Sequence, residues 1–260
     1  MNPFLLSAFI IFGYMILLFG IATIKKNNGV ADIGWGLGAV IVALVTYFVY
    51  SGGTKHQQLI TYLVFLWGMR LSAYIALRSW GKPEDFRYAN WRKAWGERVL
   101  VRSFFQVFML QGAILFIHTL PIIIINAYST IYGSYKWLYP LGTAVWLLGF
   151  LIEGVSDKQM YEFKNDPHPH KQKVMNKGLW KYSRHPNYFG ECLVWWGVFL
   201  IAIPSGYWYI SVLAPITITY LLLKVSGVTM LEKKYEGDDQ YSEYKRTTSA
   251  FVPWLPKSAK

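Results

Sequence analysis

Apolar residues dominate seven long runs of this sequence, and shorter polar stretches separate them. The runs lie near residues 4–24, 30–50, 59–78, 104–126, 138–157, 187–203 and 207–229. A hydrocarbon core of ~30 Å is crossed by about 17–25 helical residues, so each run is long enough to span a membrane. The pattern predicts an all-α, polytopic integral membrane protein with seven transmembrane helices.

The basic residues between these runs indicate how the chain is threaded. If the N-terminus lies outside, 23 of the 26 Lys and Arg fall in the cytoplasmic connections or the tail. Only Lys55 and Lys136 then lie outside, and Arg70 lies within a span. Because Lys and Arg accumulate on the cytoplasmic side, we expect the N-terminus outside and the C-terminus in the cytoplasm.

The composition favours one membrane domain over residues 1–260. Hydrophobic residues make up 54% of the chain, charged residues 15%, and the mean hydropathy is +0.26. In a soluble protein the net charge of +12 would suggest nucleic acid, but here topology and attraction to anionic lipid account for it. We therefore expect membrane lipid as a partner, no nucleic acid and no obligate protein partner.

Several polar side chains lie inside the predicted spans, where they are costly and often functional. Most of them fall in the cytoplasmic halves, and they include Asp32, Arg70, Tyr74, Glu153, Asp157, Asn187 and Glu191. Arg78, Asp157 and Lys224 are near enough to the interface to reach water by extending along the helix. The deeper members of the set predict a polar cavity that opens to the cytoplasm.

The stretch that leads into the sixth span suggests what such a cavity binds. It interleaves basic and aromatic side chains, namely Lys173, Lys177, Trp180, Lys181, Tyr182, Arg184 and Tyr188. Cations bind phosphates, aromatic faces hold a flat base, and Asn187 or Glu191 could hydrogen-bond a carboxamide or a ribose. This pattern fits a nucleotide cofactor, although a basic loop beside a membrane is also a common topology signal.

No metal site is expected. His168 and His170 flank a proline, and no Cys or carboxylate accompanies them or His185 at the spacing of metal ligands. The single Cys192 excludes both an intramolecular disulfide and a cysteine cluster.

Residues 178–191, Gly-Leu-Trp-Lys-Tyr-Ser-Arg-His-Pro-Asn-Tyr-Phe-Gly-Glu, resemble the cofactor motif of the membrane steroid 5α-reductases and sterol reductases. The resemblance extends to the C-terminal pattern over 234–253, and residues 31–36 and 66–88 resemble a bacterial branch of that family. It implies a seven-helix fold in the bacterial inner membrane, with NADPH bound from the cytoplasm by residues 149–256. It also implies hydride transfer to the carbon–carbon double bond of a lipid-like enone, such as a 3-keto-4-ene steroid.

The motif and the resemblance together give a set of candidate cofactor-binding residues. These are Asp157, Lys164, Lys173, Lys177, Trp180, Tyr182, Arg184, His185, Asn187, Glu191, Tyr235 and Tyr244. Asn187 and Glu191 match residues beside the nicotinamide, and Tyr235 and Tyr244 match tyrosines that help to close the site. Lys164 and Lys173 stand where the family uses arginines, which weakens a bidentate phosphate clamp.

The candidate catalytic residues are Asp32, Tyr74 and Glu191. The family residues that hold the steroid ketone have no clear equivalent here, so Asp32 and Tyr74 are chosen by position in the second and third spans. A buried, protonated Asp32 could donate to the developing enolate oxygen. Alternatively, Asp32 caps the second helix, because it sits where that helix begins.

Two other functions remain open. Arg-His-Pro-x-Tyr-x-Gly also occurs in membrane methyltransferases of the isoprenylcysteine and phospholipid type, which bind S-adenosylmethionine. Those enzymes carry an Arg-x-x-Glu-Glu-like segment after the last span, whereas residues 227–234 here contain one Glu and no Arg. The third alternative is a lipid-binding or scaffold protein whose polar cavity is only a packing network.

Overall fold

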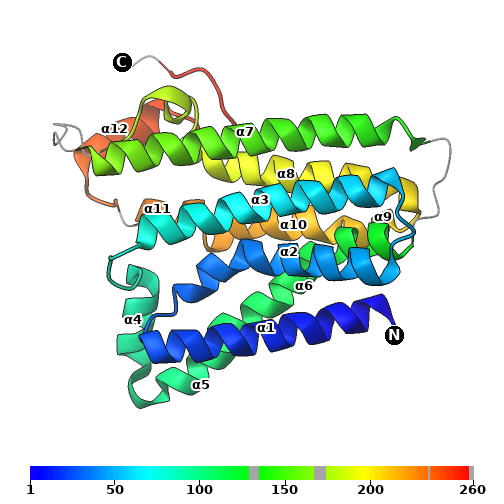
Figure 1. Ribbon diagram of the computed structural model, residues 1–260. Coiled ribbons are helices and arrows are strands. Elements are labelled where there is room, and N and C mark those ends of the chain that lie inside the picture. The colour runs from blue at the N-terminus through cyan, green and yellow to red at the C-terminus, as the bar shows by residue number, and fades with distance from the viewer. Residues whose placement is uncertain (129–134, 167–173, 234, 258–260) are drawn as a thin grey trace. The chain divides into compact units, whose positions relative to one another are not determined.

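The computed structural model describes residues 1–128, 135–166, 174–233 and 235–257, and all regular elements of these residues are helices (Figure 1). Seven helical runs are long and apolar enough to cross a membrane. The predicted all-α, multi-pass membrane architecture is thereby confirmed. The chain divides into two compact units, Met1–Lys136 with Ala202–Ala214, and Trp137–Ile201 with Pro215–Lys260. The single domain over 1–260 stays a prediction.

The first unit begins with three long helices, α1 (Pro3–Lys25), α2 (Val30–Tyr50) and α3 (Lys55–Ser79). The side chain of Asn2 caps α1, and Thr54 forms a capping box with Gln57 at the start of α3. The backbones of α2 and α3 approach closely where two glycines meet. A methyl group added to Gly36 would lie only 2.4 Å from the Gly68 carbonyl oxygen. The first three predicted spans are therefore present as helices, and side-chain caps mark the starts of α1 and α3.

The fourth apolar run belongs to a longer helical stretch, Phe86–Ala127, of 42 residues. It consists of α4 (Phe86–Trp95), η1 (Gly96–Arg98), α5 (Val99–Ser103), the π-helical η2 (Phe104–Met109) and α6 (Leu110–Ala127). Gly96 has a φ of +51°, a conformation that glycine adopts readily, and it separates α4 from the rest. In Figure 1, α4 runs crosswise to α1, α2 and α3. Two short elements, η5 (Ile203–Ser205) and α9 (Trp208–Ser211), complete the unit.

Two acids in the turn before α4 hold that helix in place. Asp85 accepts a hydrogen bond from the Arg87 amide and caps the helix. Both carboxylate oxygens of Glu84 accept hydrogen bonds from Arg92 at 2.9 Å, and one also accepts the Asn28 amide at 2.7 Å. Burial alone would raise the pKa of Glu84, but these hydrogen bonds lower it below its usual value. The turn therefore contains an ionised, well-satisfied carboxylate.

The second unit contains α7 (Leu138–Asn165), η4 (Gly178–Lys181), α8 (Pro186–Ala202) and α12 (Asp239–Thr247). The last apolar run is broken into α10 (Leu213–Tyr220), the π-helical η6 (Leu221–Val225) and α11 (Val228–Lys233). The fifth helix continues beyond the predicted span 138–157 to Asn165. Residues 167–173, which follow Asp166, lie outside the described residues.

Glycines bring α7 and α8 into backbone contact. A methyl group on Gly149 of α7 would lie 2.6 Å from the Gly190 carbonyl oxygen, and one on Gly197 of α8 would lie 2.6 Å from the Trp146 amide nitrogen. Gly142 and Gly149 are seven residues apart on α7, as Gly190 and Gly197 are on α8. Small residues at such spacing allow membrane helices to pack closely, so the pair is built on these positions.

Gly149→Ala is expected to destabilise the protein, although alanine favours helices. The added methyl group would overlap backbone atoms of α8, and overpacking of this kind costs about 1–3 kcal/mol. Gly13→Ala in α1 is the control, because a methyl group there has no neighbour within 4 Å. Thermal unfolding in detergent should show a lower Tm for Gly149→Ala only, and equal Tm values would contradict the close packing of α7 and α8.

Glu84→Gln is expected to change how stability depends on pH. A lowered folded pKa means that ionised Glu84 contributes stability above its unfolded pKa of ~4.3, and that the contribution disappears as pH falls through the folded pKa. Melting curves between pH 6 and pH 3 should therefore fall more steeply for wild type than for Glu84→Gln. Glu97→Gln, at an exposed position on η1, should keep the wild-type slope. A wild-type slope in Glu84→Gln would contradict this role.

Candidate functional site

The contact between α7 and α8 brings polar residues of two spans together. Glu153 and Asp157, four residues apart on α7, are 2% and 4% exposed. Asn187, in the first turn of α8, donates from Nδ2 to Oδ1 of Asp157 at 3.4 Å. Gly190 sets this register, since a methyl group there would lie 2.5 Å from the Glu153 amide nitrogen. The structure therefore brings Asp157 and Asn187, two of the predicted site residues, into contact, and the polar cavity that opens to the cytoplasm stays a prediction.

The side-chain oxygen of Asn187 can accept a hydrogen bond that the described residues do not supply. Its Oδ1 is buried and has no hydrogen-bond partner among the described residues. A buried acceptor left unpaired costs about 1–3 kcal/mol. An amide N–H of a bound molecule would satisfy Oδ1 while Asp157 keeps the Nδ2 side fixed, so the pair is suited to holding a carboxamide.

Glu191 follows Asn187 by one turn on α8 and is half-buried. Both Glu191 and Glu153 lie within electrostatic range of the Cys192 thiol. The second unit thus gathers three acids and one amide within its α7–α8 pair, inside segments apolar enough to span a membrane.

The loop before α8 is anchored to α7 by hydrogen bonds. Gly178 has a φ of +59°, and the Leu179 amide next to it donates to Oε1 of Gln159 at 3.0 Å. The indole nitrogen of Trp180 donates to the Ser156 carbonyl oxygen at 3.1 Å, and its side chain is buried. Trp180, a candidate for stacking on a base, therefore packs the loop onto α7.

Arg184 joins the same loop to the C-terminal helices. Its Nε lies 2.8 Å from Oε1 of Glu232 on α11, and its Nη1 donates to the carbonyl oxygens of Lys245 and Thr248. Nε2 of His185 lies 3.4 Å from the same Glu232 oxygen. The buried Arg184 guanidinium is thus committed to protein groups, and its contact with a phosphate stays a prediction. Sequence analysis did not identify Glu232 as a site residue, although it is the one acid of residues 227–234.

The C-terminal tyrosines close this loop from the other side. Tyr244 on α12 is buried, and its hydroxyl donates to the Trp180 carbonyl oxygen at 2.5 Å. Burial raises the pKa of the Tyr244 phenol, which keeps it a donor. Tyr235 stacks on Tyr241 with 4.7 Å between ring centroids. Tyr244 therefore holds the loop before α8 against α12, and its role in closing a cofactor site stays a prediction.

Exposed cations surround the anchored loop. Lys164 at the end of α7, Lys177 and Lys181 are exposed, and Nζ of Lys181 lies 5.9 Å from the ring centroid of Tyr182. Lys173 lies outside the described residues, as do His168 and His170. Within the described part of the chain, no group of three or more His, Cys, Asp and Glu is arranged to hold a metal ion.

In the first unit, Asp32 belongs to a separate network. Its Oδ2 lies 2.7 Å from Nη2 of Arg87, and its Oδ1 accepts the Tyr88 hydroxyl at 2.6 Å. Gln111 donates in turn to the Tyr88 oxygen at 3.0 Å. The N-cap of α2 is Gly29, so the interpretation of Asp32 as a cap is wrong: Asp32 lies in the first helical turn and pairs with α4.

Tyr88 is a partner of Asp32 that the sequence did not reveal. It is buried, and its hydroxyl is held between Asp32 and Gln111, whereas Asp32 accepts both of its hydrogen bonds. Tyr74 is half-buried on α3, and the Arg78 guanidinium lies 5.5 Å from its ring centroid. The roles of Asp32 and Tyr74 as proton donors stay predictions.

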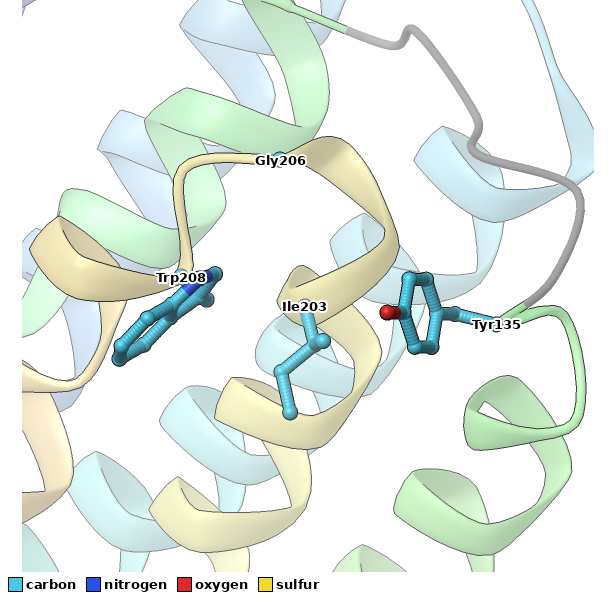
Figure 2. A pocket seen from close by; sticks show the side chains of 4 residues that line it. All are labelled: Tyr135, Ile203, Gly206 and Trp208. Carbon is cyan, nitrogen blue, oxygen red and sulfur yellow. The ribbon is translucent and has the colours of Figure 1, made fainter.

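A small pocket of the first unit is lined by Tyr135, Ile203, Gly206 and Trp208 (Figure 2). Apart from the Tyr135 hydroxyl and the Trp208 indole nitrogen, its side chains are apolar, and none belongs to the predicted site. It is therefore not a candidate for the chemistry considered above.

Comparison with known proteins places this chain in a family. The model of a family described as "Protein of unknown function (DUF1295)" matches residues 18–248. An uncharacterized protein of Schizosaccharomyces pombe is 22% identical over 227 residues, which cover 76% of this chain. The aligned part spans 64% of that relative's length. No solved structure matches the chain. Because the family model covers most of the sequence, the protein belongs to the DUF1295 family.

Proposed function

We propose that the protein is a membrane reductase that uses NADPH to reduce the carbon–carbon double bond of a lipid-like enone, such as a 3-keto-4-ene steroid. The observation that carries this proposal is the Asn187 side chain. Its amide nitrogen is fixed by Asp157, and its buried oxygen has no hydrogen-bond partner in the described chain. A nicotinamide carboxamide has the N–H group that this oxygen requires.

The cations near α8 support a phosphorylated dinucleotide. Lys164, Lys177 and Lys181 are exposed, while Arg184 is used within the protein. These lysines and Lys173 offer more positive charge than a pyrophosphate alone requires, and the 2′-phosphate of NADPH is a natural partner for the surplus. NADPH is therefore preferred over NADH in this proposal.

In the proposed reaction, the cofactor and the protein chain have different roles. Bound NADPH supplies the hydride. The chain must orient the nicotinamide, stabilise negative charge on the ketone oxygen and deliver a proton to the α carbon. Asn187 serves the first purpose. Asp32 and Tyr74 stay the predicted donors for the stabilisation of the ketone oxygen. Of the two, Asp32 accepts hydrogen bonds from Arg87 and Tyr88, so it would have to be protonated before it could donate.

The threading of the chain is part of the proposal. We infer an N-terminus outside and a C-terminus in the cytoplasm of a bacterial inner membrane, with the cofactor bound from the cytoplasm. The support is the distribution of 23 of the 26 Lys and Arg between the apolar helices.

Purified protein in detergent should be stabilised by NADPH. Ligand at 100 times its Kd adds about 2.7 kcal/mol to the free energy of unfolding, so the Tm should rise. NADH should shift the Tm less at the same concentration, and S-adenosylmethionine should not shift it. Stabilisation by S-adenosylmethionine alone would favour the methyltransferase alternative, and no shift with any of the three would contradict both enzymes.

Glu191→Gln should reduce turnover without unfolding the protein. The change removes a charge next to Asn187 but keeps the side-chain shape, and a lost charge-assisted interaction of about 1.5–3 kcal/mol lowers the rate by about 10- to 100-fold. NADPH oxidation with progesterone or another 3-keto-4-ene measures the effect. Glu162→Gln, exposed on α7, is the control and should retain wild-type turnover. Wild-type activity and Tm in Glu191→Gln would remove Glu191 from the site.

A further inference from the structure

The segment from Arg78 to Arg102 has an uneven charge arrangement. It contains seven basic residues and three acids. Glu84 pairs with Arg92, and Asp85 and Asp32 both pair with Arg87. The internal network therefore uses the acids at the start of α4 together with two of the arginines.

The remaining cations of this segment face solvent or lipid. Five of them are exposed, namely Arg78, Lys82, Lys93, Arg98 and Arg102. Glu97 is the one acid of the segment outside the network just described. The surface of this segment is therefore positively charged, and a ligand that binds to it through these cations would be negatively charged.

Aromatic and apolar side chains accompany these cations. Trp80 is 83% exposed, and Trp91, also exposed, stacks on Trp95 with 5.7 Å between ring centroids. Two exposed apolar residues, Leu100 and Val101, lie on α5 just after Arg98. Tryptophans beside basic residues are typical of the boundary between headgroups and hydrocarbon.

The backbone separates this segment from the spanning part of its helical run. The 42 residues of Phe86–Ala127 are about twice the number that a membrane crossing requires. The positive φ of Gly96 turns the chain between α4 and α5, and α4 lies crosswise to the long helices of its unit (Figure 1). The crosswise helix therefore lies along the membrane plane when α1–α3 cross the bilayer.

We propose that residues 78–102, with α4 lying in the membrane plane, form an interfacial element that binds the phosphate groups of anionic phospholipids. Trp80, Trp91 and Trp95 lie at headgroup depth, and the exposed lysines and arginines contact the lipid phosphates. The pairing of Arg87 with Asp32 fixes α4, which carries Lys93, and the other exposed cations precede or follow this helix. The site is independent of the proposed reductase activity.

Lipid association can be measured by electron spin resonance of the full-length protein in phosphatidylcholine bilayers that contain spin-labelled lipid. Spin-labelled phosphatidylglycerol should associate more strongly than spin-labelled phosphatidylcholine. The double variant Arg98→Gln/Arg102→Gln should weaken the association with phosphatidylglycerol by up to about 25-fold, because each of the two cations near an anionic lipid surface contributes a factor of about five. High salt should weaken the wild-type preference.

The matched control is Lys55→Gln/Lys136→Gln, which removes the same charge from exposed positions outside the segment. It should keep the wild-type preference, and all three proteins should have similar Tm values. Equal losses in the two double variants would show a general charge effect and overturn the assigned site. A wild-type protein without preference for phosphatidylglycerol would overturn it as well.

Discussion

The second unit depends on the backbone contact between α7 and α8. Gly149 and Gly190 leave no room for a methyl group between these helices. A membrane offers little hydrophobic driving force between helices, so such close packing is one of the few ways to hold two of them in fixed register. That register sets Asp157 against Asn187. A polar group in an apolar span is costly unless it is satisfied, and the Asn187 oxygen is one of the buried side-chain atoms to which the described residues give no hydrogen bond.

A second constraint shapes the motif that precedes α8. The basic and aromatic residues of this motif fall into two groups. Trp180 and Arg184 are buried and bind to other parts of the protein through a hydrogen bond and an ion pair. Lys177 and Lys181 are exposed. The buried residues of the motif therefore hold the loop in place, and the exposed lysines are the ones proposed to contact phosphate. Glu232 is the centre of these anchoring contacts, because it contacts Arg184 and His185 of the loop before α8 and Lys245 of α12. Fixing the loop in this way keeps the first turn of α8 in position for binding.

The helices were largely predictable, and the long-range pairings were not. Apolar runs specify the spans locally, and capping side chains add to this at α1 and α3. The helix α7 extends beyond its apolar run to Asn165, just before the Asp166–Pro167 pair. The seven-residue spacing of glycines in 142–149 and 190–197 was visible as well, but the pattern does not say which helices meet. Nothing near Asp32 indicates Tyr88, 56 residues away, so neither their hydrogen bond nor the separate role of α4 could be read from local signals. Position alone suggested a cap, which the structure assigns to Gly29.

The central claim is that the Asn187–Asp157 pair holds a nicotinamide. An experimental structure of the protein with NADPH tests it most directly. Our account predicts density for the nicotinamide ring beside Asn187, with the carboxamide hydrogen-bonded to Oδ1 and Asp157 still bonded to Nδ2. Density for the nicotinamide elsewhere, or an Asn187 side chain unchanged and unliganded under saturating NADPH, would contradict the account.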